Sequence, residues 1–148
     1  MPTTKLHDLI ALAQEPSSSR RRELLRGVTD LFFTAADPRA TSEMSLFDDI
    51  MTQLAGEMEE AVRIELAQRI GGAEPAPVGL VRTLAQDASI AVASPVLQNS
   101  TALTDEDLLS VAQTRGQDHL RAISRRAVVS EAVSEVIVKR GDDVTVGA

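Results

Sequence analysis

Hydrophobic residues recur along this chain with the three-to-four-residue spacing of amphipathic helices, most clearly in the stretch 104–141. Thr104, followed by three acidic residues, predicts a helix start, and Gly116 predicts its end. After a second predicted helix, the pattern restarts at Ser130 and stops at Gly141. The predicted starts lie 26 residues apart (104 to 130) and the glycines 25 apart (116 to 141). This spacing predicts a repeated helical hairpin.

The rest of the chain shows the same helical periodicity and no sustained alternation typical of strands. Pro95 should bend one of these helices or delay its start. For the whole chain, including the stretch 104–141, we expect about nine or ten helices in an all-α fold. The further helices are predicted at residues 4–15, 19–34, 42–55 (with Ser45 as an alternative start), 57–70, 77–86 and 90–97.

The clearest break in the pattern is the glycine- and proline-rich stretch 71–77. We expect it to join two parts of one domain, 1–148: an N-terminal helical layer over 1–74 and helical repeats over 75–148. Because a single hairpin cannot bury its apolar face alone, the repeats should stack as an α-solenoid. The seven residues after Gly141 are too few for a partner helix, so the last repeat is expected to be incomplete.

The predicted core is aliphatic, since only 2% of the residues are aromatic and there is no Trp or Tyr. If the helical register is right, Leu109→Ala or Ile123→Ala should cost about 2–5 kcal/mol of stability. The predicted core residues are Leu24, Val28, Leu31, Leu54, Leu66, Leu84, Leu109, Leu120, Ile123, Val133 and Ile137.

Several short motifs are distributed along the chain. They are Val28-Thr29-Asp30-Leu31-Phe32, Arg63 with Glu65-Leu66-Ala67, Leu84-Ala85-Gln86-Asp87 with Ile90, Val92-Ala93, Pro95-Val96-Leu97 and Ser100, Leu108-Leu109, Gly116-Gln117 with His119-Leu120, Ala122-Ile123 and Arg125, and Val133-Ser134 with Arg140-Gly141-Asp142. Together these motifs make the chain resemble the bacterial domain of unknown function 2336. The resemblance extends over nearly the whole chain and implies HEAT-like helical repeats. It implies no particular activity.

Charge and composition narrow the classes of function. The net charge of −7 at pH 7 argues against a general nucleic-acid surface, because phosphate binding needs an excess of basic groups. The absence of Cys excludes disulfides, thiolate metal sites and cysteine nucleophiles. No run of 18 apolar residues and no signal-like segment is present, so we expect a soluble, cytoplasmic protein.

No catalytic, cofactor-binding or metal-binding constellation emerges from the sequence. The acidic residues near 48 and 57–60 adjoin apolar stripes and are interpreted as solvated helix faces. The two histidines, His7 and His119, are far apart, and His119 is interpreted as a surface or hairpin-junction residue. A Gly-x-Ser-x-Gly nucleophile motif is absent. We therefore expect no enzyme activity and no cofactor.

Two arginine clusters are the candidate partner-binding residues. Arg20, Arg21 and Arg22 fall in the first turn of a predicted helix, where the helix dipole disfavours positive charge. They either pair with acidic residues such as those at 57–60 or bind an anionic partner. Arg125 and Arg126 form a second cluster, in which one side chain is expected to face solvent and the other to pack its stem.

These observations favour a non-enzymatic protein–protein interaction module, an adaptor or regulator that presents a helical-repeat surface. The alternatives are a nucleic-acid-associated repeat protein and a small-ligand sensor. Because no complete partner helix is predicted after the helix 131–140, part of its apolar stripe is expected to be uncovered. We expect this C-terminal edge of the repeats to form a homodimer or to be continued by further helices.

Overall fold

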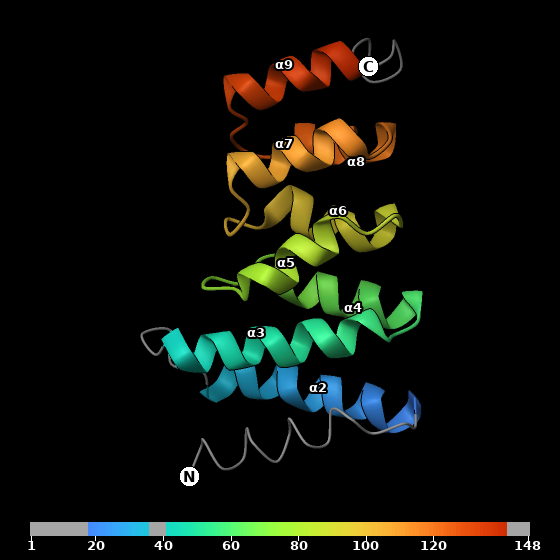
Figure 1. Cartoon of the computed structure of the whole chain (residues 1–148), viewed down its shortest axis with the longest axis vertical. Helices are drawn as coiled ribbons and strands as arrows, with labels where there is room; N and C mark the ends of the chain where they lie inside the picture. Colours follow the sequence, from blue (N-terminus) through green and yellow to red (C-terminus); the bar gives the residue numbers. More distant parts are fainter. Residues whose placement is uncertain (1–17, 36–40, 142–148) are drawn as a thin grey trace. The chain divides into compact units, whose positions relative to one another are not determined.

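The computed structural model describes residues 18–35 and 41–141, and this part of the chain contains eight helices and no strand (Figure 1). The predicted all-α fold is confirmed. The helix expected at 4–15 and the residues after 141 lie outside the described residues. The helices are α2 (Ser18–Ala35), α3 (Thr41–Gly56), α4 (Glu60–Ile70), α5 (Val78–Ala85), α6 (Ile90–Asn99), α7 (Asp105–Thr114), α8 (Gln117–Ser124) and α9 (Glu131–Arg140).

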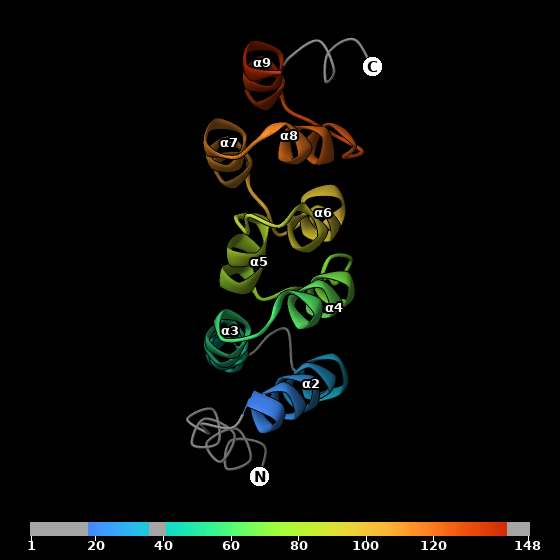
Figure 2. The same ribbon diagram turned by 90° about the vertical axis from the view of Figure 1, so that its right-hand side faces the viewer.

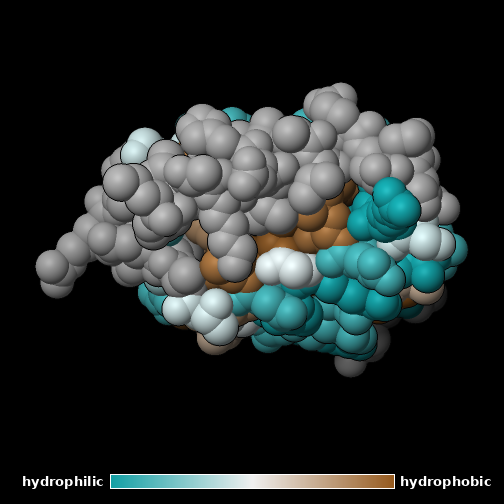
Figure 3. Space-filling model, turned by 90° about the horizontal axis from the view of Figure 1, so that it is seen from below, coloured by the Kyte–Doolittle hydropathy of each residue, from teal (hydrophilic) through white to brown (hydrophobic). Residues whose placement is uncertain are grey.

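The chain divides into two compact units, residues 1–63 and 64–148. In the first unit α2 packs against α3, and the rings of Phe32 and Phe47 meet edge to face with centroids 5.6 Å apart. Phe33 remains 44% exposed on α2. Figure 3 shows hydrophobic side chains, in brown, next to hydrophilic ones, in teal.

In the second unit the helices α5 to α9 pack on one another. Helix α5 packs on α6, α6 on α8, and α9 on both α7 and α8. Figure 2 shows α5 and α7 along one side of this unit and α6 and α8 along the other. The predicted joint 71–77 lies within this unit. A Cβ atom on Gly71 would lie 2.7 Å from the carbonyl oxygen of Pro95, so glycine permits the close approach to α6.

The helix starts of the predicted repeats follow the sequence pattern. The Thr104 hydroxyl accepts a hydrogen bond from the Asp107 N–H at 3.2 Å, and the Asp107 carboxylate accepts one from the Thr104 N–H at 3.0 Å. At the next predicted start, the Ser130 hydroxyl accepts from the Val133 N–H at 3.3 Å. These caps satisfy N–H groups that have no partner within the helix. The predicted starts at Thr104 and Ser130 are therefore confirmed.

The core is aliphatic, as predicted, but the prediction that three particular leucines belong to it was wrong. Leu24, Leu31 and Leu109 are only half-buried, whereas the adjacent apolar residues Leu25, Phe32 and Leu108 are buried. In each case two consecutive apolar residues fit the helical period, and the position of the neighbouring helix decides which one faces inward. The predicted core residues that are buried are Val28, Leu54, Leu66, Leu84, Leu120, Ile123, Val133 and Ile137.

Among the residues that the structure describes, no helix combines the length and the apolarity needed to cross a membrane.

Candidate interaction surfaces

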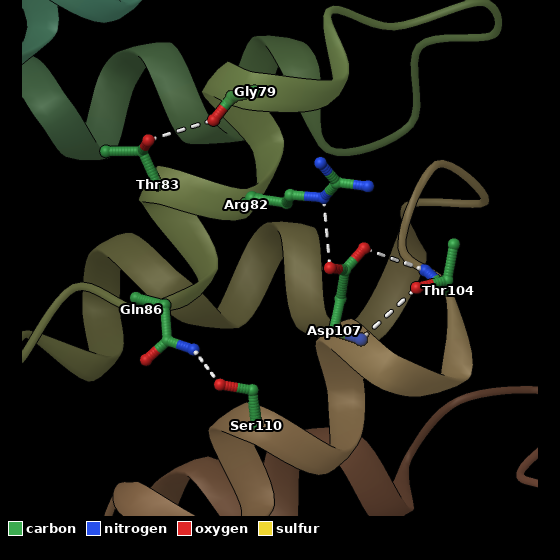
Figure 4. Close-up of polar contacts among 7 residues, drawn as sticks. All are labelled: Gly79, Arg82, Thr83, Gln86, Thr104, Asp107 and Ser110. Atoms are coloured by element: carbon green, nitrogen blue, oxygen red, sulfur yellow. Dashed lines mark hydrogen bonds and ion pairs between the residues drawn. The ribbon is translucent and has the colours of Figure 1, made fainter.

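Four polar side chains link α5 to α7, and we call them the α5–α7 polar row: Arg82, Gln86, Asp107 and Ser110. The Arg82 Nε lies 3.0 Å from the Asp107 Oδ1, and the Gln86 Nε2 donates to the Ser110 Oγ at 3.1 Å (Figure 4). Arg82 on α5 and Gln86, the C-cap residue of α5, are about one turn apart, as Asp107 and Ser110 are on α7, so the two contacts run side by side. The row connects the two helices by one ion pair and one hydrogen bond.

Asp107 is the electrostatic centre of this row. Partial burial of its carboxyl group opposes ionisation, but the hydrogen bonds with Thr104 and Arg82 and the charge of Arg82 outweigh burial, so the pKa of Asp107 is lowered. The carboxylate is also in the first turn of α7, where negative charge is favoured by the helix dipole. Asp107 is therefore ionised at neutral pH, and one side chain both caps α7 and holds Arg82.

Arg126 joins the end of α8 to the end of α6. Its Nη1 donates to the carbonyl oxygen of Leu97 at 2.6 Å, and its Nη2 donates to that of Ser100 at 2.8 Å. Carbonyl groups in the last turn of a helix have no partner within the helix, so these bonds satisfy them. Burial lowers the pKa of the Arg126 guanidinium, and the nearby charge of Asp105 partly offsets this effect.

Arg140 makes the equivalent bridge between α9 and α7. It donates to the carbonyl oxygens of Ala112 and Arg115, the latter at 2.6 Å. The carbonyl oxygen of Arg140 in turn accepts a hydrogen bond from Gln117 Nε2 at 2.8 Å. The same arrangement therefore occurs in both stacked pairs, α6 with α8 and α7 with α9. Arg126, which follows α8, donates to carbonyl oxygens at the end of α6, and Arg140, which ends α9, donates to carbonyl oxygens at the end of α7.

The cluster Arg20–Arg22 lies at the start of α2, where no acidic residue occupies the first turn. The Arg21 Nε is 3.4 Å from the Glu57 carboxylate, and the Arg22 Nη2 is 2.6 Å from that of Glu59. The alternative in which these arginines pair with residues 57–60 is therefore what the geometry shows for Arg21 and Arg22. Arg20 is exposed and also has an interaction within the chain. Partner binding by this cluster stays a prediction.

The cluster Arg125–Arg126 separates into two environments. Arg125 is exposed at the C-cap of α8, whereas Arg126 is half-buried and bridges to α6. This agrees with the expectation that one side chain faces solvent and the other packs its stem. Of the two arginines, only Arg125 is exposed, and its binding of a partner stays a prediction.

A hollow of about 290 Å³ lies where α7 passes into α8, lined by residues 114–119 together with Ala88 and Ile90. His119 is 5% exposed, and its Nε2 lies 2.8 Å from the carbonyl oxygen of Asp87. Of the two predicted alternatives, a surface or a hairpin-junction residue, the structure shows the second, because His119 is buried at the junction. In the described ranges, no group of three or more His, Asp or Glu side chains converges to hold a metal ion.

Sequence reasoning singled out Arg126 as a candidate partner-binding residue, not as a bridge between helices. It did not identify Arg82, Asp107 or Arg140 as residues that connect successive helix pairs. Each contact joins positions one repeat apart: Arg82 to Asp107 and Arg140 to Arg115 are both separated by 25 residues (107 − 82 and 140 − 115). The sequence contains this repeat spacing, because Gly116 and Gly141, the predicted helix ends, are also 25 residues apart. A search for donor and acceptor side chains at the repeat spacing would have found Arg82 and Asp107. It would not have found Arg140, whose acceptors are backbone carbonyl oxygens.

Comparison with known families bears on the second unit. Residues 92–148 match the family described as an uncharacterised protein conserved in bacteria (DUF2336). The resemblance to the domain of unknown function 2336 is thereby confirmed, and the matched segment contains α7, α8, α9 and most of α6. No curated protein and no solved structure matches the chain.

Proposed function

We propose that this chain, whose residues 92–148 belong to the DUF2336 family, is a non-enzymatic protein–protein interaction module of the cytoplasm. In this proposal the helix pairs of the second unit form a HEAT-like α-solenoid, and a partner segment binds along the faces of successive helices. The observation that carries the proposal is the stacking of α6 on α8 and of α7 on α9, with arginine bridges at the end of each pair.

The bridges bear on binding because they hold the helices in one arrangement. A surface whose side chains are already ordered loses less conformational entropy when a partner binds. In the α5–α7 polar row, Arg82 is 54% exposed by side chain and Ser110 is exposed, so both remain accessible while paired. The row offers a partner hydrogen-bond donors and acceptors from two successive helices, which suits recognition of a polar protein segment.

A nucleic-acid partner is less well supported. The chain carries a net charge of −7, and Arg21, Arg22, Arg126 and Arg140 are held by carboxylates or carbonyl oxygens within the described part of the chain. Arginines in such contacts would have to leave them to neutralise phosphates. Binding to duplex DNA that weakens steeply with added salt, measured by gel shift, would favour the nucleic-acid alternative.

The proposal is tested by affinity capture with two matched variants. Ser110→Arg places a long charged side chain in the polar row, and Ser124→Arg makes the same change at an exposed position of α8. A protein captured by the parent and by Ser124→Arg but lost from Ser110→Arg would support the proposal. If the captured proteins are the same for all three, the polar row is not the binding surface.

A further inference from the structure

We propose that the outer face of α9 binds the α9 of a second copy of this chain in antiparallel orientation. This interface is separate from the α5–α7 polar row and holds independently of the partner proposed there. The sequence led us to expect that uncovered apolar residues of the helix 131–140 form the contact. In the structure Val133 and Ile137 are buried, so the apolar stripe is largely covered and cannot form this contact. The face that remains open carries three charged residues and one exposed valine, Val138.

The open face of α9 carries a shallow groove of about 300 Å³ lined by Glu131, Ser134, Glu135, Val138 and Lys139. These positions are three to four residues apart and therefore form one face of the helix. Val138 is 63% exposed, and both glutamates and Lys139 are exposed as well. A second helix laid along this groove would cover Val138.

The order of charges along α9 argues for a second copy as the occupant. The first half of the face is acidic, with Glu131 and Glu135, and its end is basic, with Lys139. In an antiparallel pair related by twofold symmetry, Glu135 of each copy lies opposite Lys139 of the other. A parallel pair would instead place like charges side by side. The face is thus complementary to itself in one orientation only, which is the property of an isologous interface.

The size of the face sets the strength of the contact. A helix of ten residues is about 15 Å long, so this contact buries less than the roughly 1,200 Å² of a stable interface. The dimer should therefore be reversible, with the monomer prevailing at low protein concentration. Because its main attractions are exposed ion pairs, association should weaken as ionic strength rises.

The test uses charge reversal, with sedimentation equilibrium of the full chain over a concentration series at low salt. Glu135→Lys and Lys139→Glu each place like charges opposite one another in a homodimer, so each variant should associate at least about tenfold more weakly than the parent. Mixing the two variants restores opposite charges at both positions and should yield a heterodimer. The double variant, with both charges exchanged, should regain the parent's association.

Glu106→Lys is the matched control, since it makes the same charge change at an exposed position of α7. It should associate as the parent does. Circular dichroism of each variant separates loss of association from loss of helix, because Glu135 and Lys139 are also one turn apart on the same helix. Recovery of association on mixing cannot arise from that intrahelical pair. A parent that stays monomeric at every concentration, or single variants that associate like the parent, would overturn the proposal.

Discussion

The bridge from Arg126 to the end of α6 gives the sharpest test of how the second unit is held together. Replacing Arg126 by Ala removes the donors to the carbonyl oxygens of Leu97 and Ser100. Ser100 is fully buried, so water reaches this end of α6 poorly. The variant leaves two carbonyl groups without their partners and also loses the packing of the arginine stem.

The magnitude follows from the kind of bond that is lost. A hydrogen bond to a charged group contributes about 1.5–3 kcal/mol, and an unsatisfied buried acceptor costs a similar amount. Two such bonds to one half-buried guanidinium are not additive, since ordering the side chain and removing it from water offset part of the gain. We expect Arg126→Ala to lower the free energy of unfolding by about 2–4 kcal/mol. Arg126→Lys, with a single ammonium group, should fall between the parent and Ala.

The assay is urea unfolding followed by circular dichroism at the helical band, because the chain contains no Trp or Tyr to report by fluorescence. Arg125→Ala is the matched control, as it removes the neighbouring arginine, which is exposed. It should change the free energy of unfolding by less than about 0.5 kcal/mol. The midpoint should shift for Arg126→Ala with little change in the dependence on urea.

Equal stability of the Arg125→Ala and Arg126→Ala variants would refute this reasoning. It would mean that the carbonyl groups at the end of α6 are satisfied without the arginine, for instance by water. A marked change in urea dependence for Arg126→Ala alone would instead indicate that α8 and α9 unfold separately from the rest.

Three further predictions follow from the same contacts. Leu108→Ala should cost about 2–5 kcal/mol and Leu109→Ala clearly less, measured by the same urea titration, because only Leu108 is buried. Asp107→Asn should be less stable than the parent at neutral pH. Because folding lowers the pKa of Asp107, its contribution is complete above the unfolded value of about 3.9 and is lost as the pH falls through the folded value, so the two stability curves should converge in acid. Arg22→Ala should cost at most about 1 kcal/mol, less at high salt, because its ion pair with Glu59 is exposed; a larger, salt-independent loss would contradict this.

The periodicity of the sequence was sufficient to predict the helices of the second unit. The starts at Thr104 and Ser130 depend on side chains within three residues of the cap, and such local contacts can be read along the chain. For the same reason the all-α fold could be predicted without tertiary information. The interpretation of residues 71–77 as a joint between a helical layer and the repeats stays a prediction.

Tertiary structure decided which of two consecutive apolar residues faces the core. It also decided which arginines donate hydrogen bonds to carbonyl groups of another helix. Leu108 and Leu109 satisfy the helical period equally, and only the direction of the neighbouring helices separates them. Likewise, Arg125 and Arg126 are identical by local pattern, yet only Arg126 lies within reach of the carbonyl groups that end α6, about one repeat earlier in the chain. The sequence determined where the helices begin because capping is local, whereas the roles of these side chains depend on contacts between residues about 25 or more positions apart.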